Sequence, residues 1–141
     1  MAPKANIELV LQEIECKNVS ETRWDSMADV LGVPQGSLKG SAAIVDRGND
    51  FIALGHVRLD HPKTYMYSFF FFTFSKSPPF RVTGVSRRFV FNDPLKVHYI
   101  AGIALIDDFY VLGCSVRDRT VEFIWVHKNK IDELVKEHKP N

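Results

Sequence analysis

The chain has 141 residues, of which 45% are hydrophobic and 25% are charged, and its formal net charge is +1. This composition is typical of one globular domain with a sizeable core, and the small net charge excludes a global field that would select nucleic acid or an acidic membrane. The N-terminus lacks a long apolar segment followed by small residues, so no signal peptide is expected. Cys16 and Cys114 stand in no metal-ligand or CxxC spacing, which favours two free buried thiols.

The N-terminal part of the chain combines one predicted strand with one ambiguous stretch. Ile7–Cys16 alternates apolar with polar or smaller residues until Ile14 breaks the register, which indicates a strand, with a short amphipathic helix as the alternative. Arg23–Leu31 is ambiguous, although its apolar residues have helical spacing. These residues are Trp24, Met27 and Leu31. Gly32–Gly36, which contains two glycines and a proline, ends any helix there.

An antiparallel meander of four short strands is predicted next. The loop Asp46–Asp50 offers glycine and asparagine for left-handed backbone positions, and prolines mark the two later turns, His61–Lys63 and Ser75–Pro79. The predicted strands are Ser41–Val45, Phe51–Leu59, Thr64–Phe74 and Phe80–Val85.

The third of these strands, Thr64–Phe74, is apolar at odd and at even positions alike. Because alternate side chains of a strand point to opposite faces, both of its faces need a cover. A buried helix is the alternative, but the aromatic enrichment and the flanking prolines favour a strand. One face is expected to meet the second set of strands or a neighbouring copy of the chain. The run Phe69–Phe72 is therefore interpreted as packing residues and not as a ligand platform.

A second set of three strands and a C-terminal helix complete the chain. The predicted strands are Val97–Leu105, Phe109–Ser115 and Thr120–His127, with turns at Asp107–Asp108 and Arg117–Arg119. Asn129 is expected to cap a helix over Lys130–Glu137. The apolar stripe of that helix consists of Ile131, Leu134 and Val135.

These elements predict an all-β fold with a short C-terminal helix. Short strands at a spacing of about twelve residues suggest a sandwich, a barrel or a propeller. A sandwich strand should have one polar face, whereas a propeller blade packs on both faces, so the pattern favours a partial β-propeller of about two antiparallel four-stranded blades. The chain is then a single domain or a fragment, with a complete blade at about 37–90, a second blade at about 95–127 and the helix at 129–138.

Three stretches carry a resemblance to a known family: LKGSAAIVDRGNDFIALGHVRL, YSFFFFTFSKSPPFRVTGVSRRFVF and KVHYIAGIALIDDFYVLGCSVRD. Together they resemble the C-terminal part of a carbohydrate-active five-bladed β-propeller family, which includes the β-mannoside phosphorylases of glycoside hydrolase family 130 and has glycosyltransferase-associated relatives. The resemblance covers about Ser37–Val126 and is distributed over the stretches instead of residing in one diagnostic motif.

The resemblance implies a small set of site residues. Lys39 matches the basic residue before a glycine, and His56 matches a strand-end histidine; in the phosphorylases these positions help to hold inorganic phosphate. Asp118, with Arg117 beside it, matches the aspartate near the central funnel, although Ser115 stands where the family usually has glycine. The residues alone leave plainer alternatives open: solvation for Lys39, a structural or merely exposed histidine for His56, and turn chemistry or a surface ion pair for Asp118.

The family's general-acid region has no counterpart in this chain. A glycosidic bond needs a proton donor for its leaving oxygen, so the isolated chain is expected not to turn glycosides over by that mechanism. The function expected from the resemblance is a glycosidase-like propeller segment that contributes part of a glycan- and phosphate-binding site. The alternative is a non-catalytic glycan- or protein-binding β module, and an interaction sandwich unrelated to sugars is a third possibility. The expected partners are carbohydrate, inorganic phosphate, and either a second copy of the chain or further blades of a longer chain; no cofactor, metal, nucleic acid or membrane is implied.

Overall fold

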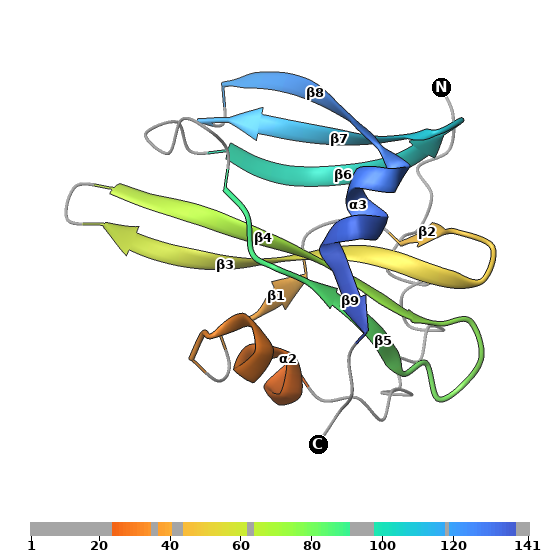
Figure 1. The fold of residues 1–141 in the computed structure, drawn as a ribbon. Helices are drawn as coiled ribbons and strands as arrows, with labels where there is room; N and C mark the ends of the chain where they lie inside the picture. Colours follow the sequence, from red (N-terminus) through yellow and green to blue (C-terminus); the bar gives the residue numbers. More distant parts are fainter. Residues whose placement is uncertain are drawn as a thin grey trace, which may run out of the picture.

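A computed structural model of the chain describes residues 24–34, 37–40, 44–61, 64–90, 98–117 and 119–137 (Figure 1). The described part is mostly β and contains two antiparallel sheets. The elements are α2 (Trp24–Leu31), β1 (Lys39–Gly40), β2 (Val45–Asp46), β3 (Asp50–His61), β4 (Thr64–Ser75), β5 (Val82–Ser86), β6 (His98–Ile106), β7 (Phe109–Val116), β8 (Thr120–His127), α3 (Lys128–Leu134) and β9 (Val135–Glu137). The larger sheet has the order β1-β3-β4-β5-β9, with β2 also paired to β3, and the smaller sheet has the order β6-β7-β8.

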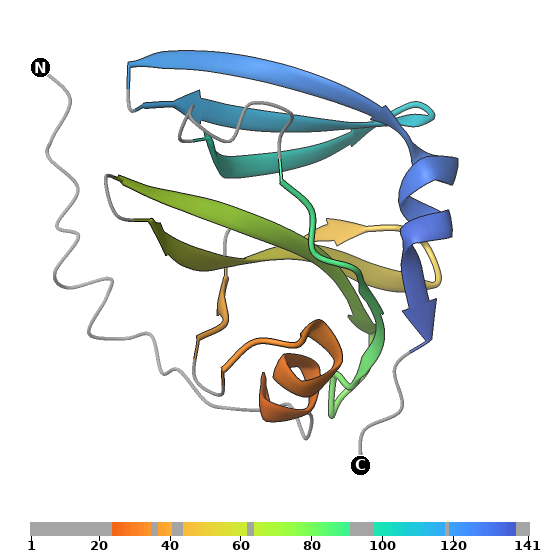
Figure 2. The ribbon, with the colours of Figure 1, turned by 60° about the vertical axis from the view of Figure 1, so that its left-hand side comes forward.

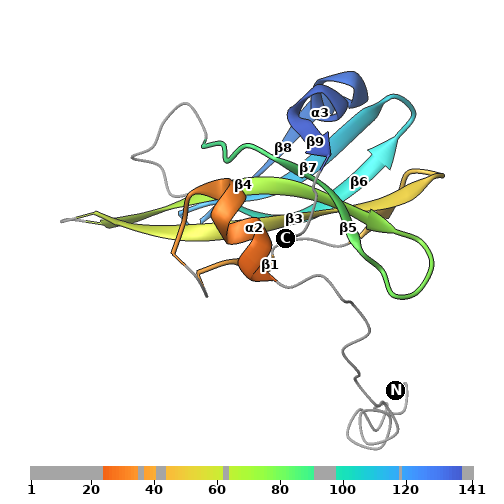
Figure 3. The ribbon, with the colours of Figure 1, turned by 60° about the horizontal axis from the view of Figure 1, so that its bottom comes forward.

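The elements form three layers. Figure 2 shows the smaller sheet on one side of the β3–β4 hairpin and α2 on the other, while α3 and β9 run down one side of the molecule from the smaller sheet to the larger. The view in Figure 3 also places α2 against β3 and β4, with the smaller sheet behind them. The prediction of an all-β protein is therefore confirmed at the level of its sheets, and α2 is a helix in addition to the expected C-terminal one.

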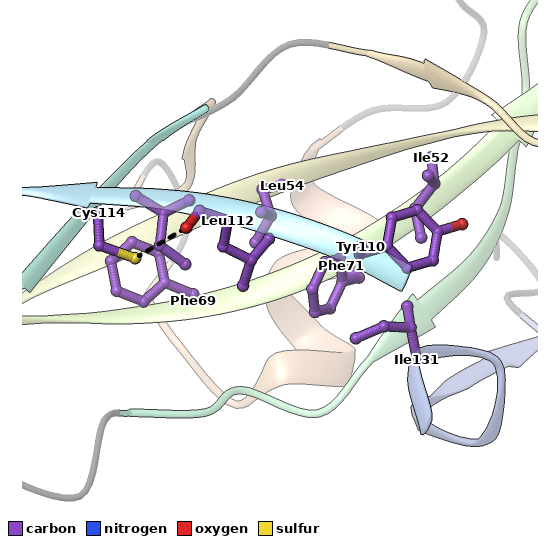
Figure 4. Close-up of a cluster of buried hydrophobic side chains, with 9 residues drawn as sticks. Ile52, Leu54, Phe69, Phe71, Tyr110, Leu112, Cys114 and Ile131 are labelled. Atoms are coloured by element: carbon purple, nitrogen blue, oxygen red, sulfur yellow. Dashed lines mark hydrogen bonds between the residues drawn. The ribbon is translucent and has the colours of Figure 1, made fainter. Parts of the chain in front are cut away.

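The aromatic strand β4 is central, and its alternation sorts the phenylalanines between two cores. Phe69 and Phe71 point toward the smaller sheet, where they join residues of β3, β6, β7 and α3 in one buried cluster (Figure 4). That cluster consists of Ile52, Leu54, Phe69, Phe71, Ile100, Tyr110, Leu112, Cys114 and Ile131. Phe70 faces the other way. The interpretation of Phe69–Phe72 as packing residues agrees with the nearly complete burial of Phe69, Phe70 and Phe71, while Phe72 is partly buried against the second cluster.

The second face of β4 is covered by α2, which the sequence pattern had left unplaced. Met27, Ala28 and Leu31 of this helix pack with Leu38 and with Phe70 in a second buried cluster. Gly32, which has a φ of +67°, stops the helix, and the amide of Val33 donates to the carbonyl of Ala28, as in a Schellman motif. A short helix ended by glycine therefore covers the face that, in a chain of strands alone, would need another sheet.

The structure changes several predicted boundaries. Of the predicted strand Ser41–Val45, only Ile44 and Val45 lie among the described residues; Val45 belongs to β2, which pairs with β3, and Lys39–Gly40 also pairs with β3 as β1. Asn129 does not cap the last helix: its amide donates to Nδ1 of His127, which is the N-cap, at 3.2 Å. The helix ends at Leu134 because Val135–Glu137 pairs with the otherwise free edge of β5 as β9. The predicted strand Ile7–Cys16 lies outside the described residues.

Ser86 fills a gap in the pairing between β4 and the segment that follows β5. The β5 strand ends at Ser86, and the chain rejoins β4 only at Phe89, whose amide and carbonyl both bond to Phe69. Between these points the Ser86 hydroxyl accepts a hydrogen bond from the amide of Phe71 at 2.8 Å and donates to the carbonyl of Arg87 at 2.9 Å. The hydroxyl thus takes the place of a strand carbonyl.

Replacing Ser86 by alanine is expected to lower the free energy of unfolding by about 1–3 kcal/mol, because the buried amide of Phe71 loses its partner. Chemical denaturation followed by circular dichroism measures the loss. Ser75→Ala is the matched control, because the Ser75 hydroxyl bonds in an exposed turn, where water can replace it. Equal losses for the two variants would contradict this account of Ser86.

Candidate functional site

The structure brings Lys39 and His56 together. They are directly opposed residues of the antiparallel pair β1–β3, so their side chains leave the sheet on the same face. His56 is in turn opposite Phe69 of β4, which points into the core between the sheets. Lys39 itself is exposed and His56 is half-buried. The pair therefore sits at the border between the inter-sheet core and solvent.

His56 belongs to an aromatic triad, which we define as His56, Tyr67 and Tyr99. The three ring centroids are 5.2–5.3 Å apart, and the rings meet edge to face. His56 and Tyr67 come from the larger sheet, whereas Tyr99 comes from β6, so the triad joins the two sheets at one end of the molecule. Phe69 continues the contact into the core, with its ring centroid 6.3 Å from that of Tyr67.

The environment of His56 favours its neutral form. Burial lowers the pKa of its imidazole below the ordinary value, and the nearby Lys39 ammonium lowers it further. A neutral imidazole offers one donor and one acceptor, which suits a hydroxyl group as a partner. The same neutral imidazole is a weak proton donor at neutral pH, so His56 is suited to binding more than to general-acid catalysis.

The lowered pKa of His56 predicts a pH dependence. Unfolded His56 takes up a proton near 6.5, its ordinary pKa, and folded His56 does so only at lower pH. Between those two values the unfolded state holds more protons, so the stability that His56 contributes is complete above pH 6.5 and is lost as the pH falls toward the folded pKa.

An NMR titration of the His56 ring measures this shift directly. The expected midpoint lies below 6.5 in the unmodified protein. Lys39→Gln raises it only part of the way, because burial is the larger cause, and the control Lys130→Gln leaves it unchanged. A midpoint at or above 6.5, or one insensitive to Lys39, would contradict the geometry described above.

Arg117 lies in the turn between β7 and β8, next to Val116, which pairs with His98. It is therefore at the same end of the smaller sheet as Tyr99, the residue that follows His98. Its backbone is left-handed, with a φ of +51°. Asp118 lies outside the described residues. Of the predicted site residues, the structure pairs Lys39 with His56 and places Arg117 at the end of the smaller sheet that meets them.

Tyr67 and Tyr99 are the residues that sequence reasoning missed. Tyr67 was counted only among the apolar positions of the predicted strand Thr64–Phe74, and Tyr99 lies one position after His98, the first residue of β6. A signal for Tyr67 was present in the pairing of two adjacent predicted strands: Tyr67 lies opposite Arg58 and next to the Phe69–His56 pair. No comparable signal existed for Tyr99, because it reaches His56 through the packing of separate sheets.

Arg58 and Asp60 continue the row of His56 along β3 and form an ion pair, with Nε and Oδ1 3.2 Å apart. Both side chains are largely exposed. Asp60 is four residues beyond His56, which corresponds to about 13 Å along an extended strand. The Asp60 carboxyl group therefore lies well away from the aromatic triad.

The described residues also form a cavity of about 360 Å³ at the far end of β3, and none of the predicted site residues lines it. Arg47 dominates this cavity, but its guanidinium is fully engaged. Nε and one terminal nitrogen bind the Asp50 carboxylate at 2.7 and 2.8 Å, and the other terminal nitrogen binds Asp132 of α3 at 2.8 Å. These bonds hold the β2–β3 hairpin against α3, and the residues that they join line the cavity.

Comparison of the chain with protein-family models, with curated proteins and with solved structures returned no match. Among the described residues, the helices are too short to cross a membrane. Cys114 is a free thiol buried between the sheets, and burial raises its pKa to about 11, so it is a poor nucleophile. Cys16 lies outside the described residues.

Proposed function

We propose that this chain is a segment of a carbohydrate-active β-propeller that contributes part of a glycan- and phosphate-binding site and does not turn glycosides over alone. One observation carries the proposal. Lys39 and His56 lie 17 positions apart in the sequence, and each was assigned to phosphate by the resemblance alone; in the structure they are strand partners. Two residues with a common assigned ligand must lie on one surface, and these do.

The surroundings of the pair suit a sugar that carries or accompanies an anion. Lys39 supplies a positive charge in solvent, where it can meet a phosphate oxygen. The rings of Tyr67 and Tyr99 supply apolar edges and hydroxyl groups for the C–H and O–H groups of a sugar. Neutral His56 adds a donor and an acceptor between them. Arg117, at the same end, adds a second cation.

In the propeller interpretation, each of the two sheets is one blade. Two antiparallel sheets packed face to face are also the arrangement of neighbouring blades. In this proposal the larger sheet corresponds to the blade at 37–90 and the smaller sheet to the blade at 95–127, with further blades of a longer chain or a second copy completing the assembly.

A non-catalytic glycan- or protein-binding module is the second candidate, and α2 favours it. This helix covers the face of the larger sheet on which a ring of blades would place another blade. A sheet with both faces already covered can stand alone. The two candidates share the site at Lys39 and His56, and they differ in whether other blades are required for binding.

Isothermal titration calorimetry of mannosides, with and without inorganic phosphate, tests the site. Binding is expected, with affinity that increases in phosphate. Lys39→Ala should weaken the phosphate-dependent part about tenfold, the loss of one charge-assisted hydrogen bond. His56→Ala should weaken binding in both conditions, and the control Lys130→Ala, an exposed lysine of α3, should bind normally. No heat in any combination, or an equal loss in the control, would refute the site.

A further inference from the structure

We propose that the outer face of the smaller sheet packs against the same face of a second copy of this chain, forming a two-fold dimer. Figure 2 shows this sheet at the outside of the three layers. Its inner face carries Tyr110, Leu112 and Cys114 of β7, which are buried in the core between the sheets. Alternate residues point the other way, away from the larger sheet and from the pair of Lys39 and His56. The dimer therefore does not depend on glycan binding.

The outer face of this sheet is apolar on all three strands, and we call it the open face. The register places Trp125 opposite Val111, which in turn lies opposite Ala104, so one row crosses the whole sheet. Large side chains of this face are exposed to an unusual extent. Ile106, Phe109, Val121, Phe123 and Trp125 are 45%, 39%, 68%, 69% and 57% exposed. The open face consists of Gly102, Ala104, Ile106, Phe109, Val111, Gly113, Val121, Phe123 and Trp125.

The open face is large enough for a specific interface. An aromatic side chain presents about 150–250 Å², and with somewhat less for an aliphatic one the exposed fractions of the five large side chains correspond to roughly 500 Å². A contiguous apolar patch of several hundred Å² on a soluble protein marks a contact surface. Contact between two such faces buries roughly 1,000 Å² from these side chains alone, which reaches the lower limit for a specific interface.

The layering of the described residues leaves one face of this kind, which favours a closed pair. The larger sheet is covered by the smaller sheet on one side and by α2 on the other. A unit with one open face is completed by a second copy and then has no such face left for a third. The open face carries no charged residue, and the net charge of +1 per chain adds little repulsion between copies.

The relief of the open face is complementary to itself. Phe123 projects from β8, and its cross-strand row continues through Gly113 to Gly102 of β6. The Phe123 ring lies 3.7 Å from a Cβ atom placed at Gly113, whereas no atom lies within 4 Å of one placed at Gly102. A two-fold axis between the faces, parallel to the strands and over β7, places each β8 over the partner's β6. Phe123 of each copy then fills the recess at Gly102 of the other, as side chains do between sheets packed about 10 Å apart.

Sedimentation equilibrium over a wide concentration range tests the dimer. The unmodified chain should approach twice the monomer mass as its concentration rises. Phe123→Asp should keep the monomer mass, because dimerisation would bury two unpaired carboxylates. Val30→Asp is the control: it places the same charge on an apolar residue of α2 that is 62% exposed, and it should dimerise normally. A chain that stays monomeric throughout, polymers larger than a dimer, or equal behaviour of the two aspartate variants would overturn the proposal.

Tryptophan fluorescence shows whether the open face is what the dimer buries. Trp24 and Trp125 are the two tryptophans of the chain, so Trp125 alone reports in a Trp24→Phe background. Its emission should shift to shorter wavelength over the concentration range in which the mass doubles, and Phe123→Asp should abolish the shift. A dimer that leaves the emission of Trp125 unchanged would refute packing through this face.

Filling the recess at Gly102 tests the register. Gly102→Leu should raise the dissociation constant of the dimer about tenfold or more, because the leucine occupies the space of the partner's Phe123. The folded monomer should accept the leucine, since no atom lies near a Cβ at that position. Gly40→Leu makes the same change at an equally open glycine of β1 and should leave the dimer unchanged. Phe123→Ala in the Gly102→Leu background should restore part of the affinity, and the absence of this rescue would contradict the contact between Phe123 and Gly102.

Discussion

Replacing Phe71 by alanine is expected to lower the free energy of unfolding by about 3–5 kcal/mol. Phe71 is 1% exposed, and its ring stacks on that of Phe89 with centroids 5.4 Å apart and planes inclined by 18°. It lies between the sheets, beside Tyr110, Leu112 and Ile131 (Figure 4). Truncation would leave a cavity that the two sheets and α3 could close only by moving together. The variant therefore loses the transfer free energy of the removed atoms and also bears the free-energy cost of the cavity.

Phe74→Ala is the matched control for this prediction. It makes the same change three residues further along β4, but Phe74 is only partly buried and its ring contacts Phe51 and Phe72 near the end of the sheet. The expected loss is about 1 kcal/mol, since solvent can fill the space. Urea denaturation of both variants measures the difference. If the Phe74 variant lost as much stability as the Phe71 variant, the assignment of the main core to the odd-numbered face of β4 would be wrong.

Gly55→Val is expected to destabilise the protein by at least about 3 kcal/mol, and Gly55→Ala by about 1–3 kcal/mol. Gly55 lies opposite Phe70, and a Cβ atom at Gly55 would meet Cε1 and Cε2 of the Phe70 ring at 2.8 Å. That ring cannot withdraw easily, because it is fully buried beneath α2. This expected loss of stability is opposite to what strand propensity predicts, because alanine and valine are both more favourable in strands than glycine.

Two further variants separate this steric explanation from a general strand effect. Gly40→Ala, at the residue paired with Gly55 on β1, adds a methyl group where no atom lies within 4 Å, and it should leave stability nearly unchanged. Phe70→Leu in the Gly55→Ala background should cost less than the sum of the two single changes, because a smaller side chain makes room for the new methyl group. Strict additivity in this double-mutant cycle would reject the contact between Gly55 and Phe70 as the cause.

Local sequence patterns predicted most strands well, but they did not predict which segments pair with the edges of the sheets. Both strands of the β3–β4 pair were predicted because alternation, aromatic content and the neighbouring Pro62 agree. Of the predicted turn His61–Lys63, His61 belongs to β3 and the other two residues lie outside the described residues. Thr120–His127 was predicted with the observed limits. The last helix was misplaced because the choice between helix and strand after Leu134 depends on β5, whose free edge accepts Val135–Glu137. That edge is more than 45 residues away in sequence and leaves no mark on the local pattern.

The candidate site shows the same division. Lys39 and His56 were singled out from residues that resemble a known pattern, and the structure makes them neighbours. Tyr99 could not be found in this way, because it meets His56 and Tyr67 only when β6 packs over the larger sheet. Arg47 lies in the predicted loop, between β2 and β3, and it also joins the β2–β3 hairpin to α3 through Asp50 and Asp132. Contacts of this kind depend on how the layers pack, which periodicity does not encode.

The sequence by itself determined that Thr64–Phe74 is a central strand with two apolar faces, because the two-residue period of a strand distributes its aromatic side chains to both sides. Only the tertiary structure decided which element covers each face. The smaller sheet covers Phe69 and Phe71, and α2 covers Phe70. The physical reason is that burial of apolar surface is non-directional: a strand can require a cover, but any apolar helix or sheet of suitable shape can provide it.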